Sequence, residues 1–264
     1  MNLIELTPSV YIFQDDNYYL VTNCCVVLDS ELIFIDTGLN DTVAKKFVKE
    51  MKNRTKIKDI RLVLTHSHGD HIRGMKPFKS CQIIVSKHFL EVLDENIKRW
   101  GWGEKIKEFY SSSNLEILAE QKTIGDENNQ IIFKQMGGHS PDSIYGYYPK
   151  DKVLFAGDNL LSKMPQYFPF DNTNLNDWIK GLKEWEKMDI DWVVVGHGDV
   201  VKKNHITRVR EFFEELVLFL EYSASKKLSV EQVLSHENCP TYFEDDPENW
   251  TITGIEAYYN RMIE

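Results

Sequence analysis

Three histidines and one aspartate lie within six residues of one another, between His66 and His71. The whole chain of 264 residues contains only eight histidines, so this segment is unusually dense in them. Neutral imidazole and carboxylate are the ligands that suit zinc, iron and similar divalent metals. The segment therefore predicts a metal-binding loop, and the chain must fold so that the remaining ligands reach it.

The spacing within this loop predicts two neighbouring metal positions. His66 and His68 are two residues apart, so in an extended segment both side chains point to the same side. Asp70 and His71 follow at a turn into a helix and can reach a second position. Ligands that share one short loop lose less conformational entropy when the site assembles.

Three distant segments place a further polar donor just beyond an apolar strand and beside glycine. These donors are His139 after residues 131–136, Asp158 after residues 152–156, and His197 after residues 192–195. Glycine permits positive φ angles and the close backbone approach that a crowded metal site requires. We therefore expect these three side chains to complete the metal site.

Hydrophobic patterning predicts an α/β chain in which two groups of strands alternate with helices. Strands are expected at residues 10–13, 19–28, 32–35, 60–64, 83–85, within 131–155, and at 191–195. Helices are expected at residues 40–52, 86–100 and 175–188, and in the segment from residue 205 onward. Residues 100–114 are polar and aromatic, as expected of an insertion or a lid.

Composition limits the classes of partner and compartment. A formal net charge of −10 argues against general affinity for nucleic acid or anionic membranes, so we expect a small-molecule partner. No apolar run approaches the roughly 18 residues of a membrane span, and residues 1–5 lack the basic start of a signal peptide. The four cysteines form no CxxC pair, which is typical of buried, reduced thiols. The expected compartment is the cytoplasm.

The ordered motifs resemble those of the metallo-β-lactamase-fold hydrolases. The motifs are HxHxDH at residues 66–71, Gly-His-Ser-Pro at 138–141, Ala-Gly-Asp at 156–158 and Gly-His-Gly at 196–198. The resemblance spans residues 36–197. It implies an α/β fold, a four-layer αβ/βα sandwich with C-terminal helices, whose site lies along one edge of the two sheets. Residues 1–204 would form the catalytic domain, and residues 205–264 a helical extension packed on the same domain.

The same resemblance implies the role of each ligand. The ligands of the first metal would be His66, His68 and His139. The ligands of the second metal would be Asp70, His71 and His197, with Asp158 bridging both. Two zinc ions are implied, with iron or manganese as alternatives. Asp36 matches an aspartate of the family that fixes the orientation of a ligand ring.

The resemblance also implies a reaction. A metal-bridging hydroxide would cleave a small ester, thioester or lactone, with Asp70 as a catalytic residue that orients the hydroxide. Asp158 occupies the position where the true β-lactamase branch commonly has cysteine, which favours the thioesterase, lactonase and phosphodiesterase branches. Two alternatives stay open: a mononuclear iron enzyme resembling the persulfide dioxygenases, and a non-catalytic binding protein on the same fold.

Residues outside the motifs are expected to select the substrate. Aromatic loops at residues 100–103 and 164–170 are predicted to wall the site, so the expected substrate contacts include Trp102, Tyr167 and Phe168. Packing of the second loop against the C-terminal helices is the alternative. Arg73, where the family more often has a small residue, is expected either to reach an anionic substrate or to form a salt bridge on its helix.

Two further expectations concern groups whose role the pattern leaves open. The three tyrosines at positions 145, 147 and 148 are candidates for a donor to the developing oxyanion. The apolar stripe at residues 212–220 would suit either the core or the interface of a homodimer.

Overall fold

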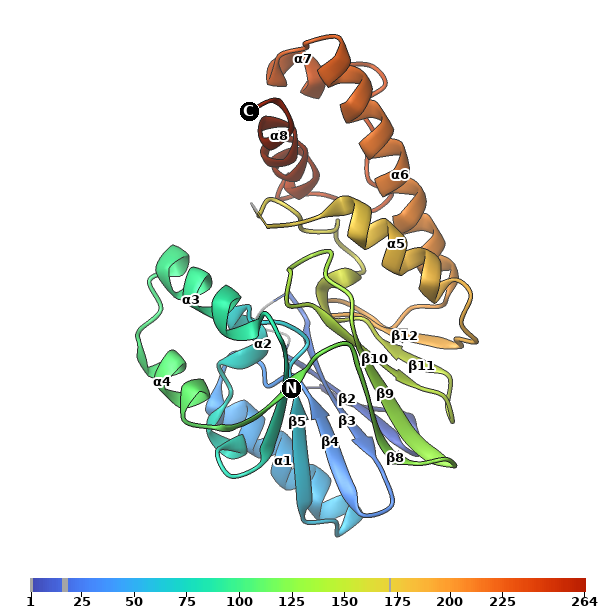
Figure 1. Ribbon diagram of the computed structural model, residues 1–264. Coiled ribbons are helices and arrows are strands. Elements are labelled where there is room, and N and C mark those ends of the chain that lie inside the picture. Colours follow the sequence, from blue (N-terminus) through green and yellow to red (C-terminus); the bar gives the residue numbers. More distant parts are fainter. Residues whose placement is uncertain (1, 16–18, 171) are drawn as a thin grey trace.

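The structure is a computed structural model, and it describes residues 2–15, 19–170 and 172–264 (Figure 1). The strands of the first sheet are β1 (Asn2–Thr7), β2 (Val10–Asp15), β3 (Val21–Val27), β4 (Glu31–Ile35), β5 (Asp59–Val63), β6 (Gln82–Ser86) and β7 (Asn114–Leu118). The strands of the second sheet are β8 (Gln121–Asp126), β9 (Asn129–Gln135), β10 (Ile144–Tyr148), β11 (Val153–Phe155) and β12 (Trp192–Val194).

The helices lie between and after these strands. The α-helices are α1 (Asp41–Thr55), α2 (Gly69–Ile72), α3 (Phe89–Trp100), α4 (Lys105–Ser111), α5 (Leu175–Trp185), α6 (Asn204–Ser225), α7 (Val230–Leu234) and α8 (Trp250–Ile263). Two short 3-10 helices are η1 (Lys76–Phe78) and η2 (Gly157–Asn159). No helix in the described ranges is long and apolar enough to cross a bilayer.

The parallel parts of both sheets bring the predicted ligand loops to common edges. In the first sheet β4 and β5 run parallel with Ile35 opposite Val63, so Asp36 and the histidine loop leave neighbouring strand ends. In the second sheet β11 and β12 run parallel with Phe155 opposite Val194. Asp158 and His197 each follow their strand by the same number of residues, so they emerge side by side.

Buried side chains of the described residues form three clusters, and these define four layers. One cluster fills the space between the two sheets. A second lies between the first sheet and α1, α3 and α4, and the third lies between the second sheet and α5, α6 and α8. Figure 1 shows α1, α3 and α4 on one side of the two sheets and α5 and α6 on the other, with α7 and α8 beyond the strand ends. The predicted αβ/βα sandwich with C-terminal helices is therefore confirmed.

Local sequence explains where the predicted helix at residues 40–52 begins. The Asn40 side chain accepts hydrogen bonds from the backbone N–H groups of Thr42 and Val43, which have no partner within the helix. The apolar residues at helical spacing turn inward against the first sheet. They are Ala44, Phe47, Val48 and Met51. The helix continues to Thr55, three residues further than its apolar pattern suggested.

The expectation of an irregular lid at residues 100–114 is only partly correct. Its centre forms α4, whose Ile106 and Tyr110 are buried against the first sheet's helices. The Tyr110 hydroxyl donates to the backbone oxygen of Ile72, 2.5 Å away, and ties this segment to the end of α2. With few apolar positions, the helical period of this short segment was too weak to recognise. The strands β1, β7 and β8 were also not predicted.

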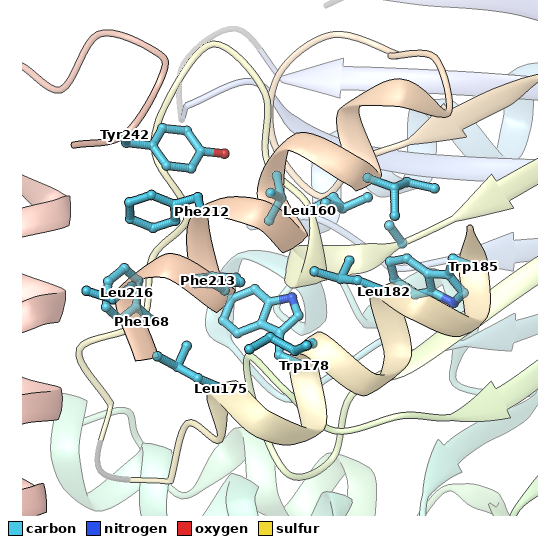
Figure 2. Packing of buried hydrophobic residues seen from close by; sticks show 14 of the residues in the cluster. Leu160, Phe168, Leu175, Trp178, Leu182, Trp185, Phe212, Phe213, Leu216 and Tyr242 are labelled. Atoms are coloured by element: carbon cyan, nitrogen blue, oxygen red, sulfur yellow. The ribbon is translucent and has the colours of Figure 1, made fainter. Parts of the chain in front are cut away.

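The C-terminal helices share a core with the second sheet. Phe212, Phe213 and Leu216 of α6 pack with Trp178 of α5 in one buried cluster (Figure 2). The apolar stripe at residues 212–220 is therefore largely core, although Leu218 on the same helix is 66% exposed.

The division of the chain after residue 204 stays a prediction. Of the cysteines, Cys24, Cys25 and Cys81 are buried.

We predict that Phe213→Ala destabilises the protein by about 3–5 kcal/mol, because it empties a fully buried ring site. Its ring lies 4.7 Å from Trp178 and 5.7 Å from Phe168, so the surrounding aromatic rings cannot easily close the gap. Chemical denaturation of both proteins measures the change. Leu218→Ala on the exposed face of α6 is the control, with an expected change within about 0.5 kcal/mol. Equal losses in both variants would contradict this packing.

Candidate metal centre

The seven predicted ligands come together in two adjacent groups. One group consists of His66, His68, His139 and Asp158, and the other consists of Asp70, His71 and His197. Within each group the possible ligand atoms all lie within 4.8 Å of one another. The predicted division of the loop between two positions is also observed: His66 and His68 belong to one group, and Asp70 and His71 belong to the other.

Asp158 lies between the two groups. Its Oδ2 is 3.7 Å from Nε2 of both His66 and His139, and 3.6 Å from Nε2 of His197. Its Oδ1 is 3.1 Å from Nε2 of His71. One carboxylate thus faces imidazoles of both groups, as a bridging ligand would.

Gly196 makes this position of the carboxylate sterically possible. A Cβ atom at Gly196 would lie only 1.9 Å from Oδ1 of Asp158. Any other residue there would displace the carboxylate from between the two groups. The glycine beside His197 is therefore required by close approach, which is one of the two reasons for which the sequence predicted it.

Asp36 orients one imidazole in each group. Its Oδ1 accepts a hydrogen bond from the backbone N–H of Thr65 at 2.7 Å, and its Oδ2 accepts from the Thr65 hydroxyl at 2.7 Å. Oδ2 also lies 2.8 Å from Nδ1 of His71. The Thr65 oxygen lies 3.0 Å from Nδ1 of His66. Protons on both Nδ1 atoms satisfy this network, and they leave the Nε2 lone pairs directed at the site.

Backbone carbonyls orient two further imidazoles in the same way. Nδ1 of His139 lies 2.9 Å from the oxygen of Tyr167, and Nδ1 of His197 lies 3.1 Å from the oxygen of Tyr19. His68 is turned differently, with its Nδ1 3.0 Å from Nε2 of His139. Four histidines thus present Nε2 to the site, and His68 presents Nδ1.

Burial keeps the first group of imidazoles neutral. Desolvation lowers the pKa of His68 to about 3 and lowers the pKa values of His66 and His139 as well. Neighbouring imidazoles act in the same direction, since each would repel a second positive charge. Neutral imidazole is the form that binds a metal, so this group is already in its ligating state at neutral pH.

The second group is dominated by its carboxylates. Burial would raise the pKa of Asp70, but His71 and His197 outweigh it and lower this pKa to about 2. Burial would lower the pKa of His197, but Asp158 and Asp70 outweigh it and raise this pKa to about 9. The same carboxylates raise the pKa of His71. In the absence of a metal ion, protonated His71 and His197 therefore compensate the negative charges of the buried carboxylates.

The donor set fits divalent metal cations. Nε2 of His66, Nε2 of His71 and Oδ1 of Asp158 are buried, and apart from the 3.1 Å approach of the last two atoms to each other they have no hydrogen-bond partner within the described part of the chain. Buried polar atoms are normally paired, and a bound cation would satisfy all three. Imidazole nitrogen and carboxylate oxygen are ligands of zinc, and of iron or manganese as well.

A cleft of about 380 Å³ opens over the two groups. The predicted substrate contacts Trp102, Tyr167 and Arg73 line it, and so do Trp100 and Phe170. Trp102 lies over the start of α2, where a Cβ on Gly69 would come within 2.7 Å of its ring. The two aromatic loops singled out in the sequence therefore do wall this cleft.

The prediction that Phe168 contacts the substrate is wrong. Its side chain is fully buried in the cluster between the second sheet and the helices, and its ring packs against Phe213 (Figure 2). Phe170, two residues later, takes the position in the cleft. Both expectations for the loop at residues 164–170 thus apply in part: Tyr167 and Phe170 line the cleft, and Phe168 between them packs in the core.

The three tyrosines of β10 are also placed away from the cleft. Tyr145 packs in the core against Trp185, with ring centroids 5.2 Å apart. The hydroxyl of Tyr147 donates to the backbone oxygen of Asp189, and that of Tyr148 donates to the Asn129 side chain. None of them lies where an oxyanion donor would be needed.

Sequence reasoning missed two aromatic residues of the cleft. Tyr19 lies just before β3, and Trp250 is the first residue of α8. Their rings are 5.3 Å apart, and Trp250 is 4.9 Å from Tyr167. Neither residue belongs to a motif, and nothing in the pattern of the C-terminal segment indicates that it returns to the site.

Comparisons with known proteins agree with this architecture. Residues 17–197 match the family model of the metallo-beta-lactamase superfamily. A "Metallo-beta-lactamase type 2" from Elizabethkingia meningoseptica is 27% identical over 233 residues, which cover 85% of this chain and 87% of that protein.

Solved structures show the same fold. A metallo-beta-lactamase from Pontibacter korlensis matches with a TM-score of 0.67 at 18% identity, covering 81% of this chain and 98% of that one. The stereoselective inverting sec-alkylsulfatase Pisa1 from Pseudomonas sp. matches with a TM-score of 0.80 at 16% identity over 98% of this chain. This chain spans 50% of the length of that sulfatase.

We predict that Asp36→Asn lowers metal affinity by about 10–100-fold, because only one terminal atom of the new amide can accept a hydrogen bond, whereas the donors of Thr65 and His71 use both oxygens of Asp36. Asparagine tolerates the left-handed backbone of Asp36 (φ 62°), so the fold should persist. Zinc titration with a competing chelator measures the affinity. Asp59→Asn, at an exposed strand end, is the control. Unchanged affinity in Asp36→Asn would contradict its orienting role.

We predict that metal-free protein loses stability as the pH rises from 6.5 toward 9. The pKa of His197 is raised from its ordinary value of 6.5 to about 9, so the folded state holds this proton more tightly than the unfolded chain. The contribution of protonated His197 to the free energy of unfolding is complete below pH 6.5 and is lost as the pH rises through about 9.

Chemical denaturation of the metal-free protein across this pH range provides the measurement. His197→Gln should give a shallower dependence, and His88→Gln, which is remote from the site, should leave it unchanged. The same slope in wild type and His197→Gln would show that this imidazole does not hold the proton.

Proposed function

The chain belongs to the metallo-beta-lactamase superfamily, whose members are generally metal-dependent hydrolases, and from that premise we propose a two-zinc hydrolase of small esters, thioesters or lactones. The observation that supports two ions is the position of Asp158 between two complete groups of ligands. A single-ion enzyme would need only one of these groups. Iron or manganese could occupy the same donors.

The two ions, when bound, lower the pKa of a coordinated water to about 7 and polarise the acyl oxygen of the substrate. Asp158, which faces imidazoles of both groups, would contribute one carboxylate oxygen to each position. Asp70, with a pKa of about 2, stays ionised at neutral pH and would accept a hydrogen bond from the attacking nucleophile. Four of the five imidazoles are fixed through Nδ1, which keeps their Nε2 lone pairs directed at the site.

The cleft supports a small substrate with an apolar group. Its volume of about 380 Å³ lies near the lower end of the range for small-molecule sites. Its walls are mainly aromatic, and they begin next to the ligand His68, whose ring is 4.7 Å from Phe170. An acyl or aryl group placed there would set its carbonyl over the two ligand groups.

We expect wild-type protein, loaded with zinc, to hold about two ions and to cleave at least one substrate in a panel of thioesters, lactones, aryl esters and phosphodiesters. The panel should include a cephalosporin and a secondary alkyl sulfate, because the similar proteins named above are β-lactamases and an alkylsulfatase. Asp158→Asn should reduce the rate by more than about 100-fold, because the bridging charge is lost.

Metal analysis and initial rates provide the measurements. Asp191→Asn, an exposed carboxylate next to β12, is the matched control and should keep both metal content and rate. Fewer than one ion per chain, or full activity in Asp158→Asn, would contradict the proposal. Oxygen consumption with glutathione persulfide would point instead to an iron dioxygenase.

A further inference from the structure

An aromatic wall leads from the C-terminal helices to the ligands. Trp250 lies 4.9 Å from Tyr167, Tyr167 lies 5.3 Å from Phe170, and Phe170 lies 4.7 Å from His68 and 5.6 Å from His139. These rings form one continuous apolar side of the cleft, from its mouth to the first group of ligands. The wall combines the loop after Asp158 with α8, which lies beyond the part of the chain that matches the family model.

The lining of the cleft itself carries one permanent positive charge, and a second guanidinium, that of Arg99, stands outside the lining, 5.5 Å from the ring of Phe170. Among the described residues that line the cleft, Arg73 is the one lysine or arginine. It closes α2, directly after the ligands Asp70 and His71, and its Cδ would lie 3.1 Å from a Cβ on Gly69. The side chain therefore runs along the start of α2, beside Trp102.

The salt bridge considered for Arg73 is not formed. Within the described residues, no carboxylate lies within the 4.0 Å ion-pair distance of its guanidinium, and the side chain is exposed. Lys76, one turn later, is instead paired with Asp41 at 2.7 Å. Arg73 thus keeps its hydrogen-bond donors available at the mouth of the cleft.

Electrostatics favours an anion at this position. The chain has a formal net charge of −10, so an anionic molecule meets general repulsion unless the cleft offers a local cation. The carboxylates Asp70 and Asp158, which also line the cleft, would be compensated by the metal cations that the ligand groups fit. A guanidinium forms two parallel hydrogen bonds with a carboxylate or sulfonate, which gives orientation as well as affinity.

We propose that Arg73 and the aromatic wall select a substrate that carries an anionic group and a flat apolar group. The anion binds Arg73, and the apolar group lies between Trp102 and the wall that ends at Trp250. The scissile carbonyl is then held over the two ligand groups. This inference rests on the proposed hydrolase function for its catalytic meaning, but the binding preference itself does not require turnover.

The binding test uses the zinc-loaded full chain and three naphthalene probes: 2-naphthoate, 2-naphthalenesulfonate and neutral 2-naphthamide. Trp100, Trp102 and Trp250 line the cleft, so quenching of tryptophan fluorescence reports occupancy. We expect both anions to bind about tenfold more tightly than the amide. A preference for naphthoate alone would show direct binding to zinc rather than to Arg73, and would overturn the proposal.

Variants separate the charge from the wall. Arg73→Met should abolish the preference for anions and leave the affinity for the amide unchanged, while Arg73→Lys should keep part of the preference. Trp250→Phe should weaken all three probes together. Lys79→Met, an exposed cation outside the cleft, is the matched control and should behave as wild type. An anion preference that survives in Arg73→Met would overturn the proposal.

Kinetics then distinguishes this inference from the proposed function. The ester of the panel that is cleaved is compared with a second ester that differs from it by a remote carboxylate. We expect kcat/KM to be about tenfold higher for the anionic ester. Cleavage without any anion preference would overturn this inference alone. Anion binding through Arg73 without cleavage of any ester would overturn the hydrolase proposal alone.

Discussion

The candidate centre depends on one buried carboxylate that is not itself a ligand. Asp36 accepts two hydrogen bonds from Thr65 and one from His71, and through Thr65 it also reaches His66. It thus fixes a ring in each of the two ligand groups. Its left-handed backbone at the end of β4 is strained for most residues, and the three hydrogen bonds hold it there.

The parallel strand pairs explain why the ligands meet. Polar residues beyond the carboxyl ends of parallel strands emerge at the same edge of a sheet. The pairs β4 with β5 and β11 with β12 deliver Asp36 beside the histidine loop, and Asp158 beside His197. The two sheets then pack face to face through a shared core, which brings the two edges together.

The candidate ligands could be predicted because they lie in short sequence motifs of characteristic residue types. A dense His-Asp loop, and glycine-flanked donors after apolar strands, indicate the site whatever the exact packing is. The aromatic cleft was only partly predictable. The loop at residues 164–170 contains three aromatic residues, and nothing in their order shows which point outward; Phe168 packs in the core, whereas Tyr167 and Phe170 line the cleft.

The sequence by itself determined the fold class and the set of candidate metal donors that the structure brings together, because strand periodicity and ligand type are local properties. Only the tertiary structure decided which side chains line the cleft. Trp250 reaches the cleft because α8 packs with α5 and α6 in the cluster against the second sheet, and Arg73 forms no ion pair because no carboxylate of the described residues lies within 4.0 Å of its guanidinium. Both outcomes depend on contacts between segments far apart in the chain, which no local pattern records.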